Sequence, residues 1–82
     1  MRLIMTPAQC RAARALLDWT QPHLAEAAGV SPSTLRDFES GKRIPIANNL
    51  AAIRAALETV GVTFLEDGDV AAGSGVAMHP TN

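Results

Sequence analysis

Cysteine is nearly absent from this chain, and so is any long apolar run. The single cysteine, Cys10, excludes an internal disulfide. We expect it to be a buried or half-buried thiol in a helix, with a reactive or regulatory thiol as the alternative. No segment reaches the roughly 20 apolar residues that cross a bilayer, and residues 1–5 are too short for a signal peptide. The sequence therefore predicts a cytoplasmic protein with no membrane segment.

The chain also lacks an excess of positive charge. Its net charge is −1 at pH 7, whereas a protein that binds nucleic acid usually carries a basic surface. The distribution is uneven, because all seven Lys and Arg lie within residues 1–54, where four acids leave a net charge of +3. Residues 55–82 hold four acids and no Lys or Arg. We expect a modestly basic head, and an acidic tail that binds a partner protein or only adds solubility.

Side chains for catalysis or metal binding are few and scattered. His23 and His79 lie far apart in the sequence, and no group of His, Cys and carboxylates has the spacing of metal ligands. The stretch Gly73-Ser74-Gly75 lacks the strand-to-helix context of a phosphate loop or a nucleophile elbow. We therefore expect no enzyme activity, no cofactor and no metal site.

What the chain does contain, over about residues 20–41, is a pair of short helices joined by a tight turn. Thr20 and Ser31 are helix caps, and a proline follows each of them in the first helical turn. Gly29 follows the first helix, where a left-handed backbone costs glycine little. Two helices this short, joined this closely, must cross steeply, and such a pair presents a recognition helix to DNA.

Caps and hydrophobic spacing predict a further helix on each side of this pair. The stretch Thr6-Pro7-Ala8-Gln9 begins a helix that runs to about Leu17. Its apolar face is expected to comprise Ala8, Ala12 and Leu16. A last helix is predicted over about residues 47–59, with its apolar face formed by Leu50, Ile53 and Leu57.

The character of the sequence changes after Gly61. Two β-prone runs, Val62–Leu65 and Val76–Met78, predict a hairpin, which is marginal in water unless it packs against a helix or a second subunit. We therefore divide the chain into a helix-turn-helix domain over residues 1–60 and a hairpin or tail for dimerisation over residues 61–82. The candidate dimer contacts are Val62, Phe64, Val76 and Met78.

The motif also resembles a known family. The residues that carry the resemblance are Gln21, Leu24-Ala25, Gly29-Val30-Ser31, Thr34-Leu35, Phe38-Glu39 and Gly41-Lys42. This pattern is similar to the phage repressor and Cro type of helix-turn-helix, often called the xenobiotic-response-element family. The resemblance implies a mainly α fold: a four-helix lambda-repressor-like DNA-binding domain with a short C-terminal β-hairpin or strand pair.

The same resemblance implies where double-stranded DNA binds. The start of the second motif helix enters the major groove, so its exposed residues are the base-reading candidates: Pro32, Ser33, Arg36 and Asp37. Arg36 is the strongest of them, because a guanidinium pairs bidentately with guanine; a phosphate contact or a solvated charge is the alternative. The phosphate-binding candidates are Gln21, Ser31, Thr34, Lys42 and Arg43. Arg14 and Glu39 match a pair that forms a salt bridge inside this fold.

These expectations lead to one main function and one alternative. The main function is a sequence-specific transcriptional regulator that binds a palindromic operator as a homodimer. Repression is favoured over activation, because the chain offers no further part to contact polymerase or bind an inducer. The alternative is an antitoxin-like or adaptor protein whose acidic tail binds a basic partner protein, which does not exclude DNA binding.

Overall fold

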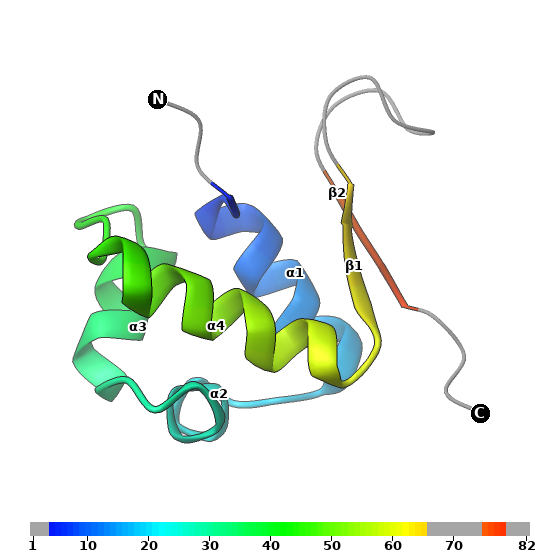
Figure 1. Ribbon diagram of the computed structural model, residues 1–82, viewed down its shortest axis with the longest axis horizontal. Helices are drawn as coiled ribbons and strands as arrows, with labels where there is room; N and C mark the ends of the chain where they lie inside the picture. Colours follow the sequence, from blue (N-terminus) through cyan, green and yellow to red (C-terminus); the bar gives the residue numbers. More distant parts are fainter. Residues whose placement is uncertain (1–3, 66–74, 79–82) are drawn as a thin grey trace.

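The computed structural model describes residues 4–65 and 75–78. Its elements follow in the order α1 (Pro7–Leu17), α2 (Gln21–Ala28), α3 (Pro32–Glu39), α4 (Ala47–Thr59), β1 (Val62–Leu65) and β2 (Gly75–Met78). The other three helices lie around α4, and the strand pair lies on the side of the bundle away from α3 (Figure 1). The predicted fold class, mainly α with a C-terminal strand pair, is confirmed. No helix in the described ranges is long and apolar enough to cross a membrane.

Side-chain caps set the starts of three helices. At α1, the Thr6 hydroxyl accepts from the Gln9 backbone N–H (3.1 Å), and the Gln9 side-chain oxygen accepts from the Thr6 N–H (2.9 Å). Thr20 caps α2 and Ser31 caps α3 by accepting the backbone N–H three residues later. Each cap satisfies an N–H that has no partner within the helix, which is why the predicted starts agree with the structure. The last helix, α4, begins after Ile46 without a side-chain cap.

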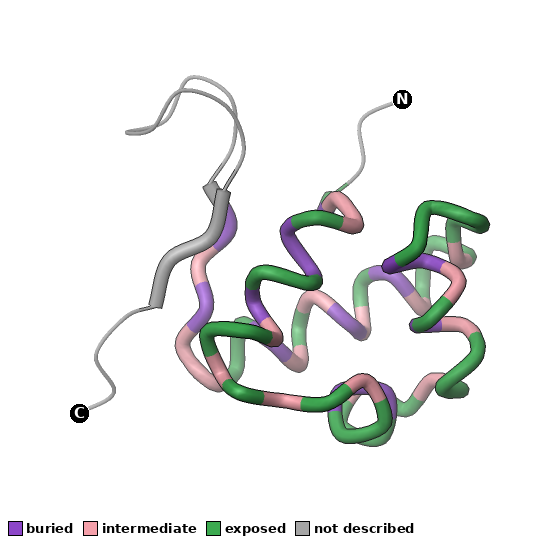
Figure 2. The backbone as a smooth tube through the Cα atoms, turned by 180° about the vertical axis from the view of Figure 1, so that it is seen from behind, coloured by how far each residue is buried: buried purple, intermediate pink, exposed green. Residues whose placement is uncertain are grey.

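The core runs from α1 through the helices to β1. Figure 2 shows the buried positions recurring along the inner side of each helix. The predicted inner residues of α4 are buried: Leu50, Ile53 and Leu57. The buried members of the core are Met5, Cys10, Ala13, Leu24, Ala25, Leu35, Phe38, Leu50, Ile53, Leu57, Val62 and Phe64. One continuous core therefore joins the motif helices to the first strand.

The predicted apolar face of α1 is wrong. Ala8 and Ala12 are exposed, and Leu16 has 51% of its surface exposed. The buried residues of this helix are instead Gln9, Cys10 and Ala13. The helix is rich in alanine on every side, so hydrophobic spacing did not distinguish its two faces. The buried face is therefore rotated by about one residue from the predicted one, and it includes Gln9 of the capping box.

The two strands pair as predicted. They are antiparallel, with Val62 opposite Met78 and Phe64 opposite Val76. The Val62 side chain is 3% exposed and that of Phe64 is 6% exposed, and both join the core of their own chain. The Arg54 guanidinium lies 4.9 Å from the centre of the Phe64 ring. Val62 and Phe64 therefore pack within their own chain, and their use as dimer contacts stays a prediction.

Two further predictions fall on parts of the chain that the structure leaves undescribed. The side chains of Val76 and Met78 lie outside the described part. Three acids of the predicted acidic tail, Glu66, Asp67 and Asp69, also lie outside the described part. The fourth, Glu58, lies in α4 and is described. Dimerisation and the tail's role therefore stay predictions.

Candidate nucleic-acid interface

The turn between α2 and α3 is built on Gly29. Its φ of +72° is left-handed, and the Gly29 N–H bonds to the Glu26 carbonyl (3.1 Å). The next N–H, from Val30, reaches back to the Ala25 carbonyl (3.0 Å). These two bonds satisfy carbonyls at the end of α2 and turn the chain sharply into α3. A built Cβ on Gly29 would meet nothing within 4 Å, so the backbone angle is what favours glycine here.

The third helix has an inner and an outer face. Leu35, Phe38 and Glu39 are buried. On the other side Pro32, Ser33 and Arg36 are exposed, with Arg36 showing 65% of its side chain to solvent. Three of the four base-reading candidates thus lie on the surface that α3 does not use for packing, and the fourth, Asp37, is half-buried.

Asp37 anchors the segment that follows α3. Its backbone carbonyl accepts from the N–H of Lys42 (2.9 Å) and of Arg43 (3.2 Å). The side chains of both basic residues are exposed. Its carboxylate lies 3.9 Å from Nε of Arg36. The Asp37 carboxylate therefore lies next to the Arg36 guanidinium, and its backbone carbonyl holds the segment that carries two further exposed cations.

Three hydroxyl groups meet at the start of α3. Oγ of Ser31 lies 2.7 Å from Oγ1 of Thr34 and 3.2 Å from Oγ of Ser33. The Ser31 hydroxyl also accepts the Thr34 backbone N–H (3.2 Å), so it serves as the helix cap. Of the three, Ser31 and Ser33 are exposed, and Thr34 is half-buried. This end of the helix can donate hydrogen bonds to an anion, and the positive end of the helix dipole also lies here.

A surface pocket of about 270 Å³ lies between α3 and the loop before α4. It brings base-reading and phosphate-binding candidates together with apolar loop residues. The lining residues are Ser33, Thr34, Asp37, Arg43, Ile44, Pro45, Ile46 and Asn49. The sequence analysis did not anticipate this pocket, although two isoleucines around a proline between the motif and the last predicted helix were a signal for an exposed apolar surface.

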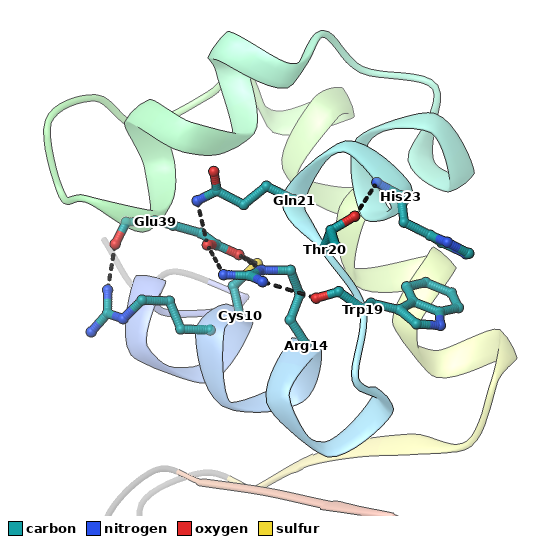
Figure 3. A network of polar contacts seen from close by, with 8 residues as sticks. Cys10, Arg14, Trp19, Thr20, Gln21, His23 and Glu39 are labelled. Atoms are coloured by element: carbon teal, nitrogen blue, oxygen red, sulfur yellow. Dashed lines mark hydrogen bonds and ion pairs between the residues drawn. The ribbon is translucent and has the colours of Figure 1, made fainter.

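Behind the outer face, one buried carboxylate organises a polar network, drawn in Figure 3. Glu39 is only 2% exposed. Its oxygens accept from Nε and Nη2 of Arg14, both at 2.8 Å, from Nε2 of Gln21 at 2.8 Å, and from the Cys10 thiol at 3.2 Å. The structure thus brings Arg14 and Glu39 into the bidentate pair that the resemblance implied.

The network changes what Gln21 can do. The resemblance made Gln21 a phosphate-binding candidate, but here one of its two amide hydrogens is donated to Glu39. The residue is half-buried at the start of α2. A phosphate contact through the other amide hydrogen stays a prediction. Local sequence patterns do not predict this bond, because the two residues lie 18 positions apart.

The charge states in the network follow from its hydrogen bonds. Burial acts to raise the pKa of Glu39, but hydrogen bonds from Arg14, Gln21 and Cys10 outweigh it and hold the pKa below its ordinary value. The hydrogen bond to Glu39 raises the pKa of Arg14. Burial, then the hydrogen bond to Glu39, raises the pKa of the Cys10 thiol. The buried group is therefore an ion pair beside a neutral thiol.

Two arginines of α1 hold the ends of neighbouring segments. Nη1 of Arg14 donates to the Trp19 carbonyl (2.9 Å), between α1 and α2. Nη1 of Arg11 donates to the backbone carbonyl of Glu39, the last residue of α3. These cations satisfy carbonyls near helix ends, which helix dipoles also favour. The first helix therefore acts as a support for the two motif helices.

Comparison with known proteins agrees with this geometry. A helix-turn-helix family model matches residues 11–65, which span from α1 to the end of β1. No curated protein matches the chain. The family match covers more than half of the sequence, and it includes the two motif helices together with Arg14, Gln21 and Glu39 of the network beneath them. The chain therefore belongs to this helix-turn-helix family of DNA-binding transcription regulators.

Proposed function

We propose that this chain is a sequence-specific repressor that binds a palindromic or pseudo-palindromic operator as a homodimer. The observation that carries the proposal is the outer face of α3, which is exposed, polar and flanked by cations, while the inner face packs into the core. A protein seated on an operator blocks polymerase without any further contact, so DNA binding is sufficient for repression. Such a regulator works in the cytoplasm, at the nucleoid.

Arg36 is the main base reader in this proposal. Its guanidinium is exposed and can pair bidentately with the O6 and N7 atoms of guanine. The Asp37 carboxylate, 3.9 Å from Nε of Arg36, orients the guanidinium or accepts from the amino group of cytosine. Ser33 reads permissively, because a hydroxyl both donates and accepts, and Pro32 offers only apolar contact.

The phosphate contacts surround this reader. Lys42 and Arg43 supply charge after α3, and the hydroxyls of Ser31 and Thr34 supply donors at its start. Gln21 has one amide hydrogen left for a phosphate. With so few cations, we expect a shallow dependence of affinity on salt, since each neutralised phosphate contributes a slope of about −0.9.

Selection from a randomised duplex library, at one stated salt concentration, tests the proposal. The wild type is expected to enrich a motif with two-fold symmetry. R36A is expected to relax one base position in each half-site and to lose about 1–3 kcal/mol. R36K is the matched control, because it keeps the charge but not the bidentate fork.

The four outcomes separate the roles. Recovery of full specificity by R36K would make Arg36 a phosphate contact. K42A is expected to weaken all sequences equally, because phosphate contacts carry no base information. An enriched motif without symmetry would contradict the homodimer, and no enrichment at low salt would contradict sequence-specific binding.

The alternative function, an antitoxin-like or adaptor protein, rests on the acidic composition of residues 55–82. A stoichiometric basic protein recovered with the full chain, but not after neutral replacement of Glu66, Asp67 and Asp69, would favour it. DNA binding by α3 is compatible with this role.

A further inference from the structure

Two isoleucines beside the recognition helix are unusually exposed. Ile44 has 64% of its surface exposed and Ile46 has 69%, compared with 51% for Leu16 and 42% for Ile4. They flank Pro45 in the loop between α3 and α4, and all three line the pocket beside Ser33 and Asp37. We call Ile44-Pro45-Ile46 the apolar loop. Neither isoleucine belongs to the core, so packing within the chain does not explain why apolar residues occupy these two positions.

The size of the protein limits where two copies can touch on DNA. Half-sites one helical turn apart place the recognition helices about 34 Å from each other. The chain itself extends 33 × 32 × 19 Å. The width of the chain is therefore close to this separation, so two copies on adjacent half-sites are near enough to touch beside α3.

Only one of the two flanks of α3 is apolar. Figure 1 shows α2 near the first turn of α3 and the loop before α4 at its last turn. The exposed residues of α2 are Pro22, His23, Glu26 and Ala27, which include a charged side chain and no large aliphatic one. The other flank carries the apolar loop. Contact between copies through the apolar loop therefore removes more apolar surface from water than contact through α2 does.

We propose that two copies of this chain meet through the apolar loop when they occupy adjacent half-sites, an inference that rests on the proposed function. The apolar loop of one copy contacts the apolar loop of the other, as in the symmetric interface of a two-fold dimer. The strand pair is less suited to this contact, because Val62 and Phe64 are already buried in their own core.

The proposed contact forms on DNA and not in free solution. Two isoleucines and a proline from each copy fall well short of the about 1,200 Å² that a stable interface buries. Arg43 immediately precedes the apolar loop, so symmetric contact also brings like charges together. DNA phosphates neutralise these charges and hold the copies in place. The free protein is therefore a monomer at micromolar concentration, and pairing shows itself as cooperative binding.

The test compares duplexes that carry one or two half-sites of the selected motif, titrated with the full-length chain in a gel-shift assay. The wild type is expected to fill two half-sites together, with little singly bound complex. The double variant I44S/I46S should keep its affinity for one half-site. Its cooperativity should fall by about tenfold or more, because the variant lacks the two isoleucines that the contact between copies would bury.

Two control variants accompany the test. I44L/I46L keeps the apolar surface and should restore cooperativity. L16S removes another exposed aliphatic side chain, in the last turn of α1, and should leave cooperativity unchanged. Thermal melting of I44S/I46S checks its fold, and little change is expected because both side chains are exposed.

Each other outcome overturns the inference in a recognisable way. Unchanged cooperativity in I44S/I46S means that the copies meet elsewhere, with the proposed function intact. Weaker binding of I44S/I46S to a single half-site means that the apolar loop contacts DNA instead. A free wild-type chain that light scattering shows to be dimeric at micromolar concentration also contradicts it. Absence of any selected motif overturns the proposed function and the pairing together.

Discussion

The side-chain amide of Gln21, the first residue of α2, donates to the carboxylate of Glu39, the last residue of α3, over 2.8 Å. The bond joins the start of one motif helix to the end of the other. Arg14 brings α1 to the same carboxylate through two bonds of 2.8 Å. A single buried acid therefore holds three helices in register, and the angle at which α3 is presented depends on it.

Loss of Arg14 should be far more damaging than loss of an exposed ion pair. R14M leaves the Glu39 carboxylate buried without its cation, which costs about 3–5 kcal/mol of unfolding free energy. That is a large part of the stability of a small domain. Urea unfolding followed by circular dichroism measures the loss.

The matched control for R14M is E58Q. Arg54 and Glu58 form an i, i+4 pair of 3.1 Å on the surface of α4, with Glu58 largely accessible. Removing this pair should change the unfolding free energy by about 0.5 kcal/mol or less. Similar losses in R14M and E58Q would contradict the dominant role of the buried pair.

Stability should fall in acid because of Glu39. Its pKa in the folded chain lies below the ordinary value, which is about 4.3 when the chain is unfolded. The ionised form therefore stabilises the fold fully above the unfolded pKa, and this contribution is lost as the pH falls through the folded pKa. Melting temperatures measured from pH 6 to pH 2.5 should decline less steeply in E39Q than in the wild type. Parallel curves would show that other carboxylates cause the acid loss.

Local chemistry made the helices predictable from the sequence. Thr6, Thr20 and Ser31 cap helices through neighbours three residues away, and Gly29 marks a left-handed turn that no distant contact decides. Each of these signals acts within one turn of helix, so the sequence contains all the information required.

Contacts between distant residues could not be predicted in the same way. The Gln21–Glu39 bond depends on how α2 crosses α3, which follows from packing and not from either residue's neighbours. The buried side of α1 was misjudged because its alanines make both faces apolar. Val62 and Phe64 lie on one face of β1, but their spacing does not say whether that face meets its own core or a second subunit.

Phe64 should contribute to the stability of the single chain. F64A removes a side chain that is 6% exposed and packs beneath the Arg54 guanidinium, and the loss should be about 3–5 kcal/mol. The unfolding midpoint of the wild type, measured at two protein concentrations tenfold apart, should not change. L16A, at an exposed position, is the control and should shift the unfolding free energy by about 0.5 kcal/mol or less. An unfolding midpoint that rises with protein concentration would instead support Phe64 as a dimer contact.

The Cys10 thiol should be protected from reagents and should weaken the fold in alkali. It is fully buried and hydrogen-bonded to Glu39, and burial raises its pKa. Only the thiolate reacts, so a disulfide reagent at pH 7.5 should label the native chain at least about a hundredfold more slowly than the chain in urea. Rapid labelling in native buffer would contradict a buried, neutral thiol.

The alkaline effect has a definite sign. A pKa raised in the folded chain means that the stabilisation is complete below the unfolded thiol pKa of about 8.5 and is lost as the pH rises above it. Between about pH 8 and pH 9.5, before lysine titrates, the wild type should therefore lose unfolding free energy relative to its value at pH 7. C10A is the control, because it has no thiol to ionise and its stability should stay level over the same interval. An equal decline of the unfolding free energy in both proteins would show that a group other than Cys10 causes the loss in alkali.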